Sequence, residues 1–278
     1  MSKIRSVRGY ALIAAGLVLL VGVLVLAAPA AAITFGEPDV ENVYSNVGTM
    51  VGNLPLGSHQ WTCSGTLIAP TVYLTAGHCV AAMQSWIAGG VITLEDVKVS
   101  FSPTNVLDQS TWLDVAGFVY HPLYGTVGVA GNTYDIGLAI LAEPVDLPLV
   151  NLPPLGFLDQ LKDEGVLVPG EDRSTLLVVG YGDYINWPQF AVLVSDGGRW
   201  YAYSGLLTFN QPSIVLSANH NLGYGGMCAG DSGGPTFVEY EGKLWQVGVH
   251  SHTGSCIGST FDYRLDTADA LDFLTAYL

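Results

Sequence analysis

A glycine-rich hexapeptide near the C-terminal end contains a serine whose surroundings suit a nucleophile. Residues 230–235 read GDSGGP, with Ser232 at the third position. A serine hydroxyl attacks a carbonyl only when a base takes its proton and donors meet the developing oxyanion. Glycines allow a tight turn and let a substrate carbonyl approach the amide N–H groups. A glycine-rich turn without chemistry is the plainer interpretation, but the complete hexapeptide favours a catalytic serine.

A histidine that could act as the base follows a short apolar run. Residues 74–79 read LTAGHC, so His78 directly precedes Cys79. A disulfide at this cysteine would hold the backbone in place, and the near-neutral pKa of imidazole suits proton transfer. A lone histidine is usually a surface or core residue, and His252 could border the site. The other histidines are assigned to surface or core positions: His59, His121, His220 and His250.

The N-terminus has the pattern of a secretory signal. Three basic residues precede an apolar stretch over residues 10–28, and residues 29–32 read PAAA. A basic region, an apolar region and a small-residue cleavage site are typical of a signal peptide, here residues 1–32. The alternative is a membrane anchor formed by residues 10–28, which are nearly long enough to span a bilayer. We expect a secreted protein.

The charge balance excludes two classes of partner. The chain has 9 basic and 24 acidic residues, and removal of residues 1–32 would leave 6 basic residues and a formal charge of −18. Such a field repels nucleic acid and anionic lipid surfaces. It suits a soluble protein outside the cell, and high-salt surroundings would explain it equally well. We expect no nucleic-acid partner, no stable membrane association after signal cleavage, and a monomer.

All four cysteines follow the signal region. An even number of cysteines in an exported chain predicts two disulfides with three possible pairings, and four free buried thiols are the alternative. No Cys-x-x-Cys unit or paired-histidine motif indicates a metal site, and we expect no cofactor. The cysteines are Cys63, Cys79, Cys228 and Cys256.

The elements that must position these residues are predicted to be mostly strands. Short runs rich in Val, Ile, Leu, Thr and Tyr alternate with Gly, Pro, Asn and Asp clusters, a pattern typical of a sandwich or barrel. Asp196-Gly197 predicts a hairpin turn between residues 192–194 and 200–203. The other predicted strands are 66–68, 72–75, 97–101, 136–141, 176–179, 214–216 and 245–249.

Two segments break the strand pattern. Residues 142–156 contain four prolines, which cannot donate to a central ladder, so a connection between two halves is expected there. Residues 267–278 place apolar side chains on one helical face, with Asp266 or Thr267 as a possible N-cap. The sequence therefore predicts an all-β chain of two barrels followed by a C-terminal helix.

The serine and histidine motifs together resemble those of trypsin/chymotrypsin-like serine proteases, and the resemblance covers essentially the whole chain after residue 32. The serine motif matches without change, and residues 76–79 (AGHC) match the family's Ala-Ala-His-Cys segment with one glycine substitution. The resemblance implies two six-stranded antiparallel barrels, with residues 33–148 carrying the histidine and the acid, and residues 149–278 carrying the serine. It also implies a secreted endopeptidase that acts on peptides or proteins.

The resemblance implies Asp135 as the acid of a Ser-His-Asp triad. Residues 133–138 (TYDIGL) are similar to the family's strand start, and the order His, Asp, Ser along the chain agrees. Asp108 and Asp114 are competitors, but neither opens a strand of that form. The oxyanion hole would be the backbone N–H groups of Gly230 and Ser232.

The family's disulfides suggest one of the possible pairings. Cys63 with Cys79 fits the loop around the histidine, and Cys228 with Cys256 fits the bridge at the specificity pocket.

The resemblance also suggests how the enzyme is activated. Residues 33–36 (ITFG) are similar to the family's new N-terminus, whose ammonium pairs with the aspartate before the nucleophile. We expect signal cleavage itself to expose Ile33, which then pairs with Asp231, because a buried carboxylate needs a cationic partner. A start at Ala31, or a short propeptide trimmed later, is the alternative.

Specificity is encoded more weakly. The position that forms the pocket floor in the family is Gly226, next to Met227, so no carboxylate is available there for a Lys or Arg side chain. We expect cleavage after apolar rather than basic residues, unless Asp262 enters the pocket from the far wall. Ser251 and Thr253 would lie at the strand edge that binds extended substrate.

Two other functions compete with the peptidase. A non-catalytic homologue could use the same fold as a binding surface, because fold does not imply function. Another serine hydrolase, such as an esterase of the α/β-hydrolase fold, would place the histidine after the serine, whereas His78 precedes Ser232.

Overall fold

The computed structural model describes residues 33–278 except 54–60, 127, 129–130, 171–173 and 186–192. The predicted signal peptide and its alternative, the membrane anchor, lie outside the described residues. Among the residues that are described, no helix is both long enough and apolar enough to span a membrane.

The first half of the chain forms a closed six-stranded barrel in which all paired strands are antiparallel. Its strands follow the order β2-β3-β4-β7-β6-β5. Strand β4 is buried along its whole length, which explains its continuous Val-Tyr-Leu-Thr sequence. The strands are β2 (Val47–Gly52), β3 (Trp61–Ala69), β4 (Val72–Thr75), β5 (Val97–Ser100), β6 (Leu113–Tyr120) and β7 (Gly137–Leu141).

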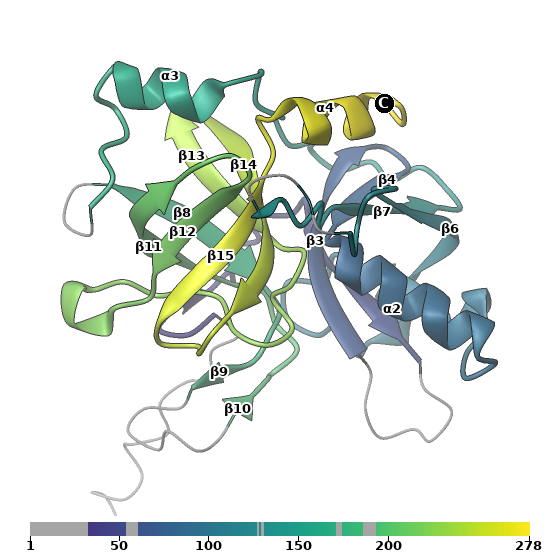
Figure 1. Cartoon of the computed structure of the whole chain (residues 1–278). Coiled ribbons are helices and arrows are strands. Elements are labelled where there is room, and N and C mark those ends of the chain that lie inside the picture. Colours follow the sequence, from purple (N-terminus) through teal and green to yellow (C-terminus); the bar gives the residue numbers. More distant parts are fainter. Residues whose placement is uncertain (1–32, 54–60, 127, 129–130, 171–173, 186–192) are drawn as a thin grey trace, which may run out of the picture. The chain divides into compact units, whose positions relative to one another are not determined.

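The second half forms another antiparallel barrel (Figure 1). Its order is β11-β12-β15-β14-β13-β8, and pairing of β8 with β11 closes it. The two-residue strand β1 (Glu37–Pro38) adds to β11. The barrel strands are β8 (Thr175–Gly180), β11 (Trp200–Phe209), β12 (Ser213–Ser217), β13 (Pro235–Tyr240), β14 (Lys243–Thr253) and β15 (Ser259–Arg264).

Helices α2 (Gly77–Ala88), α3 (Phe157–Asp163) and α4 (Ala268–Thr275) complete the described part, with short 3-10 turns at Leu94–Asp96, Gln109–Thr111 and His220–Leu222. The predicted C-terminal helix is present, and the Thr267 side chain caps it by accepting from the N–H of Ala270. Helices α2 and α3 were not predicted. Each directly follows a strand or proline-rich segment, and neither has a side-chain N-cap that the sequence could reveal.

A large apolar cluster joins the first barrel to α4. Buried side chains of α4, among them Ala270 and Leu274, pack with the interior of strands β3, β4 and β7. Val249 of β14 and Tyr263 of β15 belong to the same cluster, so the second barrel contributes to it. This shared core holds the histidine-bearing and serine-bearing halves in a common structure.

The predicted hairpin around Asp196-Gly197 is wrong. Strand β10 (Leu193–Val194) pairs with β9 (Tyr184–Ile185), whereas β11 pairs with β8 and β12. The turn residues instead bind the first half of the chain, where Gly197 accepts from the N–H of Val106. Long-range pairing has overridden the local turn preference.

The all-β prediction of two six-stranded barrels and a C-terminal helix is confirmed. The connection between the halves runs over residues 142–174, between the end of β7 and the start of β8. The predicted division at residues 148 and 149 falls within that connection and stays a prediction.

Candidate active site

His78 lies in the first turn of α2, directly after β4. Its backbone N–H donates to Asp135 Oδ1 at 2.8 Å, and its ring Nδ1 lies 2.9 Å from Oδ2. A carboxylate can only accept, so Nδ1 carries the hydrogen of a neutral ring and Nε2 is left as the basic atom. The ring is partly exposed, with 29% of the side chain accessible. This arrangement orients Nε2 for taking a proton.

Asp135 is buried just before β7, and three donor groups surround it. Besides the two bonds from His78, the Ser251 hydroxyl donates to Oδ2 at 2.6 Å. Burial alone raises the pKa of Asp135, but the bonds from His78 and Ser251 outweigh it, so the pKa is lowered overall. The carboxyl is therefore ionised at neutral pH and suited to stabilising an imidazolium.

The competing aspartates make other contacts. Asp108 caps the 3-10 turn at Gln109–Thr111 through the N–H of Ser110. Asp114 is exposed and pairs with Lys98. Among the three candidates, Asp135 is the one in hydrogen-bond contact with His78.

Ser232 lies in a turn that is pressed against the first barrel. The following residue, Gly233, has a φ of +84°, and a Cβ there would lie 2.0 Å from Thr75 Oγ1 and 2.4 Å from the Ser64 carbonyl oxygen. Only glycine permits this approach. The turn also reaches the residue after the histidine, because Cys79 Sγ is 3.8 Å from the Ser232 carbonyl oxygen.

The described residues show no hydrogen bond between the Ser232 hydroxyl and the His78 ring. The histidine and the acid are therefore brought into direct contact, whereas the serine is placed beside them. Catalytic hydrogen bonds are often long until substrate closes the site, so this geometry remains compatible with proton transfer.

Of the four backbone N–H groups of residues 230–233, two donate to backbone carbonyls of the described residues and two do not. Asp231 N–H donates to the Cys228 carbonyl, and Gly233 N–H donates to the His250 carbonyl. The N–H groups of Gly230 and Ser232 have no backbone acceptor among the described residues. Gly230 has a φ of +91°, which glycine adopts without strain. These two donors could bind an oxyanion.

Asp231 is completely buried behind the nucleophile. Its two carboxylate oxygens accept the N–H groups of Gly182 and Cys228, each at 2.8 Å. Burial raises the pKa of Asp231 well above its ordinary value, and these two bonds only partly oppose it. Ile33 is also fully buried, and the next residue, Thr34, exchanges two backbone hydrogen bonds of 3.0 Å with Gly226.

The residues predicted to bind substrate make separate contacts within the protein. A Cβ on Gly226 would lie 2.6 Å from Ala218 Cβ, so this position is closely packed. Met227 is buried. Ser251 contacts the acid, a role that sequence reasoning missed when it assigned this residue to substrate binding. Thr253 donates to the Ser255 carbonyl at 2.7 Å.

Two disulfides join the motifs to their surroundings, Cys63 to Cys79 and Cys228 to Cys256. This is the pairing that the family resemblance suggests. The ligand atoms of His78, Cys63 and Cys79 lie within 4.8 Å of one another. Both of these cysteines are in a disulfide, so neither can act as a thiolate ligand for a metal.

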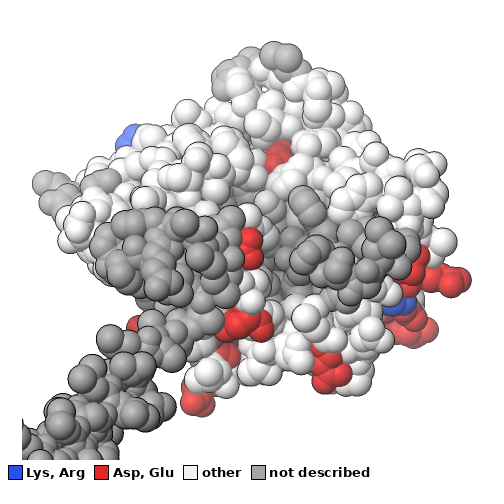
Figure 2. Space-filling view, turned by 90° about the horizontal axis from the view of Figure 1, so that it is seen from below, with Lys and Arg blue, Asp and Glu red and all other residues white. Residues whose placement is uncertain are grey.

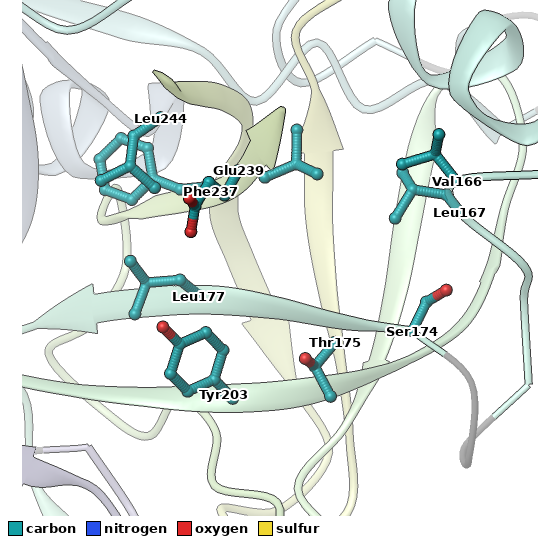
Figure 3. Close-up of a pocket in the computed structure, with 10 residues that line it drawn as sticks. Val166, Leu167, Ser174, Thr175, Leu177, Tyr203, Phe237, Glu239 and Leu244 are labelled. Atoms are coloured by element: carbon teal, nitrogen blue, oxygen red, sulfur yellow. The ribbon is translucent and has the colours of Figure 1, made fainter. Parts of the chain in front are cut away.

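A separate cavity of about 300 Å³ lies on the second barrel, and Figure 3 shows side chains of β8, β11 and β13 around it. Its lining includes Tyr203, Phe237 and Glu239. None of the predicted catalytic residues lines it.

Comparisons with known proteins cover both barrels. The Trypsin family model matches residues 40–267. The chain is similar to chymotrypsin-like elastase family member 3B of Macaca mulatta, at 29% identity over 72% of this chain and 74% of that protein. It is similar to proproteinase E of Bos taurus, at 27% over 69% and 72%. It is also similar to a trypsin of Simulium vittatum, at 28% over 72% and 73%.

Proposed function

The chain belongs to the trypsin family of serine endopeptidases, and from this premise we propose that His78, Asp135 and Ser232 form its catalytic triad. The observation that carries the proposal is the contact of 2.9 Å between His78 Nδ1 and Asp135 Oδ2, which leaves Nε2 as the basic atom of the ring. The alternative of a non-catalytic binding protein has no comparable observation in its favour.

The proposed reaction proceeds in two steps. His78 Nε2 takes the Ser232 proton as Oγ attacks the scissile carbonyl, and the N–H groups of Gly230 and Ser232 bind the oxyanion. The imidazolium then gives its proton to the leaving amine as the C–N bond breaks, which leaves an acyl-enzyme. Water, activated by His78, releases the acid product and restores the serine.

A fluorophosphonate probe tests the nucleophile. We expect the mature protein to be labelled, and Ser232→Ala to abolish both labelling and hydrolysis of a casein substrate. Ser255→Ala, which changes an exposed serine outside the triad, is the matched control and keeps its label. Labelling that survives Ser232→Ala would remove this assignment, and hydrolysis of simple esters without peptides would favour an esterase.

Activation is proposed to follow from signal cleavage after residue 32. Asp231 is buried with two N–H donors and no cation among its described contacts, and Ile33 is buried next to the segment that pairs with Gly226. A new ammonium at Ile33 would neutralise the carboxylate. N-terminal sequencing of active secreted protein should begin at Ile33, and any other start contradicts the mechanism.

We also propose that the enzyme, secreted and monomeric, cleaves after apolar rather than basic residues. Gly226 offers no carboxylate, and Asp262, the competitor, is buried with its Oδ2 bonded to the Thr236 hydroxyl at 2.5 Å. A peptide library profiled with the mature enzyme decides this. Dominant cleavage after Lys or Arg would refute it.

A further inference from the structure

His250 of strand β14 is a fully buried histidine directly behind the nucleophile turn. Its N–H donates to the Gly234 carbonyl, and its carbonyl accepts from the Gly233 N–H, both at 2.8 Å. Its ring Nδ1 lies 3.1 Å from the carbonyl oxygen of Asp231. One residue therefore contacts the chain immediately before and after Ser232.

The ring contact determines which nitrogen carries the hydrogen. A carbonyl oxygen only accepts, so Nδ1 must be the donor to Asp231. Burial lowers the pKa of His250 to about 4, although the backbone carbonyls of Asp231 and Pro235 both act to raise it, so the ring is neutral at neutral pH. With the hydrogen on Nδ1, Nε2 has a lone pair. Nε2 is buried and has no hydrogen-bond partner among the described residues. A buried acceptor without a donor is costly.

Asp262 of strand β15 carries the complementary atom. It lies opposite His250 in the ladder between β14 and β15, and opposed residues of such a ladder point to the same face. A Cβ on Gly248, two residues before His250, would lie 3.2 Å from Asp262 Cβ, which agrees with a shared face.

The Asp262 carboxyl can act as a donor when it is protonated. Oδ2 accepts from the Thr236 hydroxyl, whereas Oδ1 is buried without a partner among the described residues. Burial raises the pKa of Asp262 to about 7, despite the bond from Thr236. Below this pKa the protonated acid can place a hydrogen on Oδ1, and Nε2 of His250, on the same face of the ladder, is a second buried atom without a partner among the described residues.

We propose that His250 is a positioning residue for the nucleophile and that Asp262 holds its tautomer. The Nδ1–H bond fixes the Asp231 carbonyl and thereby the turn that carries Ser232. No direct hydrogen bond joins the two side chains, so the Oδ1–H group supplies the donor that Nε2 lacks through one buried water. This inference rests on the proposed function, because the position of Ser232 matters only if it is the nucleophile.

Paired substitutions of His250 test the first half. In His250→Asn the amide nitrogen stands in for Nδ1, whereas in His250→Gln it stands in for Nε2. We expect the first variant to retain kcat within about threefold, and the second to lose about tenfold in kcat at unchanged KM, the effect of one hydrogen bond. Equal kcat for both variants would overturn the inference. A change confined to KM or to side-chain preference would assign the ring to substrate binding instead.

Paired substitutions of Asp262 test the second half. Asp262→Asn keeps a donor toward Nε2 and an acceptor for Thr236, so its kcat should equal that of the wild type. Asp262→Val keeps neither and should lose kcat as His250→Gln does. If the asparagine variant is as poor as the valine variant, an ionised carboxylate is needed and the proposed acid partner is wrong.

A spectroscopic experiment separates this inference from the proposed function. The 15N spectrum of the histidine rings in Ser232→Ala should show a buried ring protonated at Nδ1 and not at Nε2 between about pH 5 and 6, below the pKa of Asp262. That signal should vanish in the double variant with His250→Asn. A wild type without label or activity would refute the peptidase, while the opposite tautomer in an active enzyme would refute only the positioning role.

Discussion

The pKa of Asp135, the acid of the proposed triad, depends on the groups that donate hydrogen bonds to it. Burial by itself would favour the neutral form of Asp135, yet its bonds from His78 and Ser251 lower its pKa. An ionised buried carboxylate can fix the tautomer of His78 and stabilise its imidazolium.

Replacing the carboxylate should therefore abolish most of the activity while preserving the fold. Asp135→Asn can donate to His78 Nδ1 and so favours the wrong tautomer. We expect kcat to fall by about 10⁴, the value for the template of this family. Steady-state kinetics on the purified variant provide the measurement, with circular dichroism as the control, and a loss below tenfold would contradict the assignment of Asp135.

Ser251→Ala should have a smaller effect with a distinct pH dependence. Loss of the bond of 2.6 Å to the ionised Asp135 should cost about 2 kcal/mol of stability at neutral pH. Because the folded pKa of Asp135 is lowered, its stabilising contribution is present above its unfolded pKa of about 4 and is lost as the pH falls through the folded value.

Urea unfolding of Ser251→Ala and wild type at several pH values measures this effect. The difference in unfolding free energy between the two proteins should be largest near pH 7 and should shrink at the acid end. A difference that grows toward acid pH would mean that the hydroxyl does not act through Asp135.

At the scale of elements, the site depends on a close contact between the nucleophile turn and strands β3 and β4. Gly233 makes that contact, and any Cβ would meet the backbone oxygen of Ser64 at 2.4 Å. Gly233→Ala should displace Ser232 and lower kcat/KM by at least 10², because small misplacements of reacting groups are costly.

The kinetics of Gly233→Ala are compared with those of Gly242→Ala. Both glycines have a positive φ, but a Cβ on Gly242 meets nothing within 4 Å, so this variant shows the cost of backbone strain alone. Similar activity in the two variants would show that the close contact is not what places the serine.

The disulfide at the start of α2 should stabilise both the fold and the site. Cys63 and Cys79 are 16 residues apart, and closing such a loop contributes roughly 3 kcal/mol. Replacing both cysteines with alanine should lower the unfolding free energy by about this amount, as measured in guanidinium. It should also reduce activity at temperatures where the protein remains folded, because His78 precedes Cys79 in the helix. A variant of unchanged stability would contradict this view.

At the scale of the whole molecule, acidic residues outnumber basic ones on a surface that is mostly uncharged. The face in Figure 2 shows scattered acidic side chains and few basic ones. Part of the small positive charge is also hidden, because Arg199 and Arg264 are buried in ion pairs with Asp39 and Asp266. Each of these arginines is buried together with its aspartate, so the two ion pairs leave the net negative charge of the surface unchanged.

Repulsion between the acidic side chains at the surface predicts that salt stabilises the protein. Screening at 1 M NaCl shortens the Debye length to about 3 Å, so the melting temperature should rise relative to low salt. Thermal unfolding in NaCl and in KCl gives the comparison, and equal shifts would indicate screening. A melting temperature that is unchanged or lower in salt would show that repulsion does not limit stability.

The chain's own sequence was sufficient to propose the residues that carry the chemistry. The segments around His78 and Ser232 are contiguous motifs, so their proposed roles could be inferred without a fold. The β-rich alternation predicts barrels because successive side chains of a strand point to opposite faces. The C-terminal helix was also predictable, since its apolar face and the Thr267 cap are local features.

Only the tertiary structure decided which residues surround these motifs. Ser251 contacts Asp135, and His250 lies behind Ser232, because strand β14 passes both, which no local pattern indicates. The expected hairpin at Asp196-Gly197 is wrong for the same reason: pairing of β11 with β8 and β12 outweighs a turn preference. Local patterns act over a few residues, whereas a barrel brings together residues far apart in the chain, and their partners determine pKa, tautomer and position.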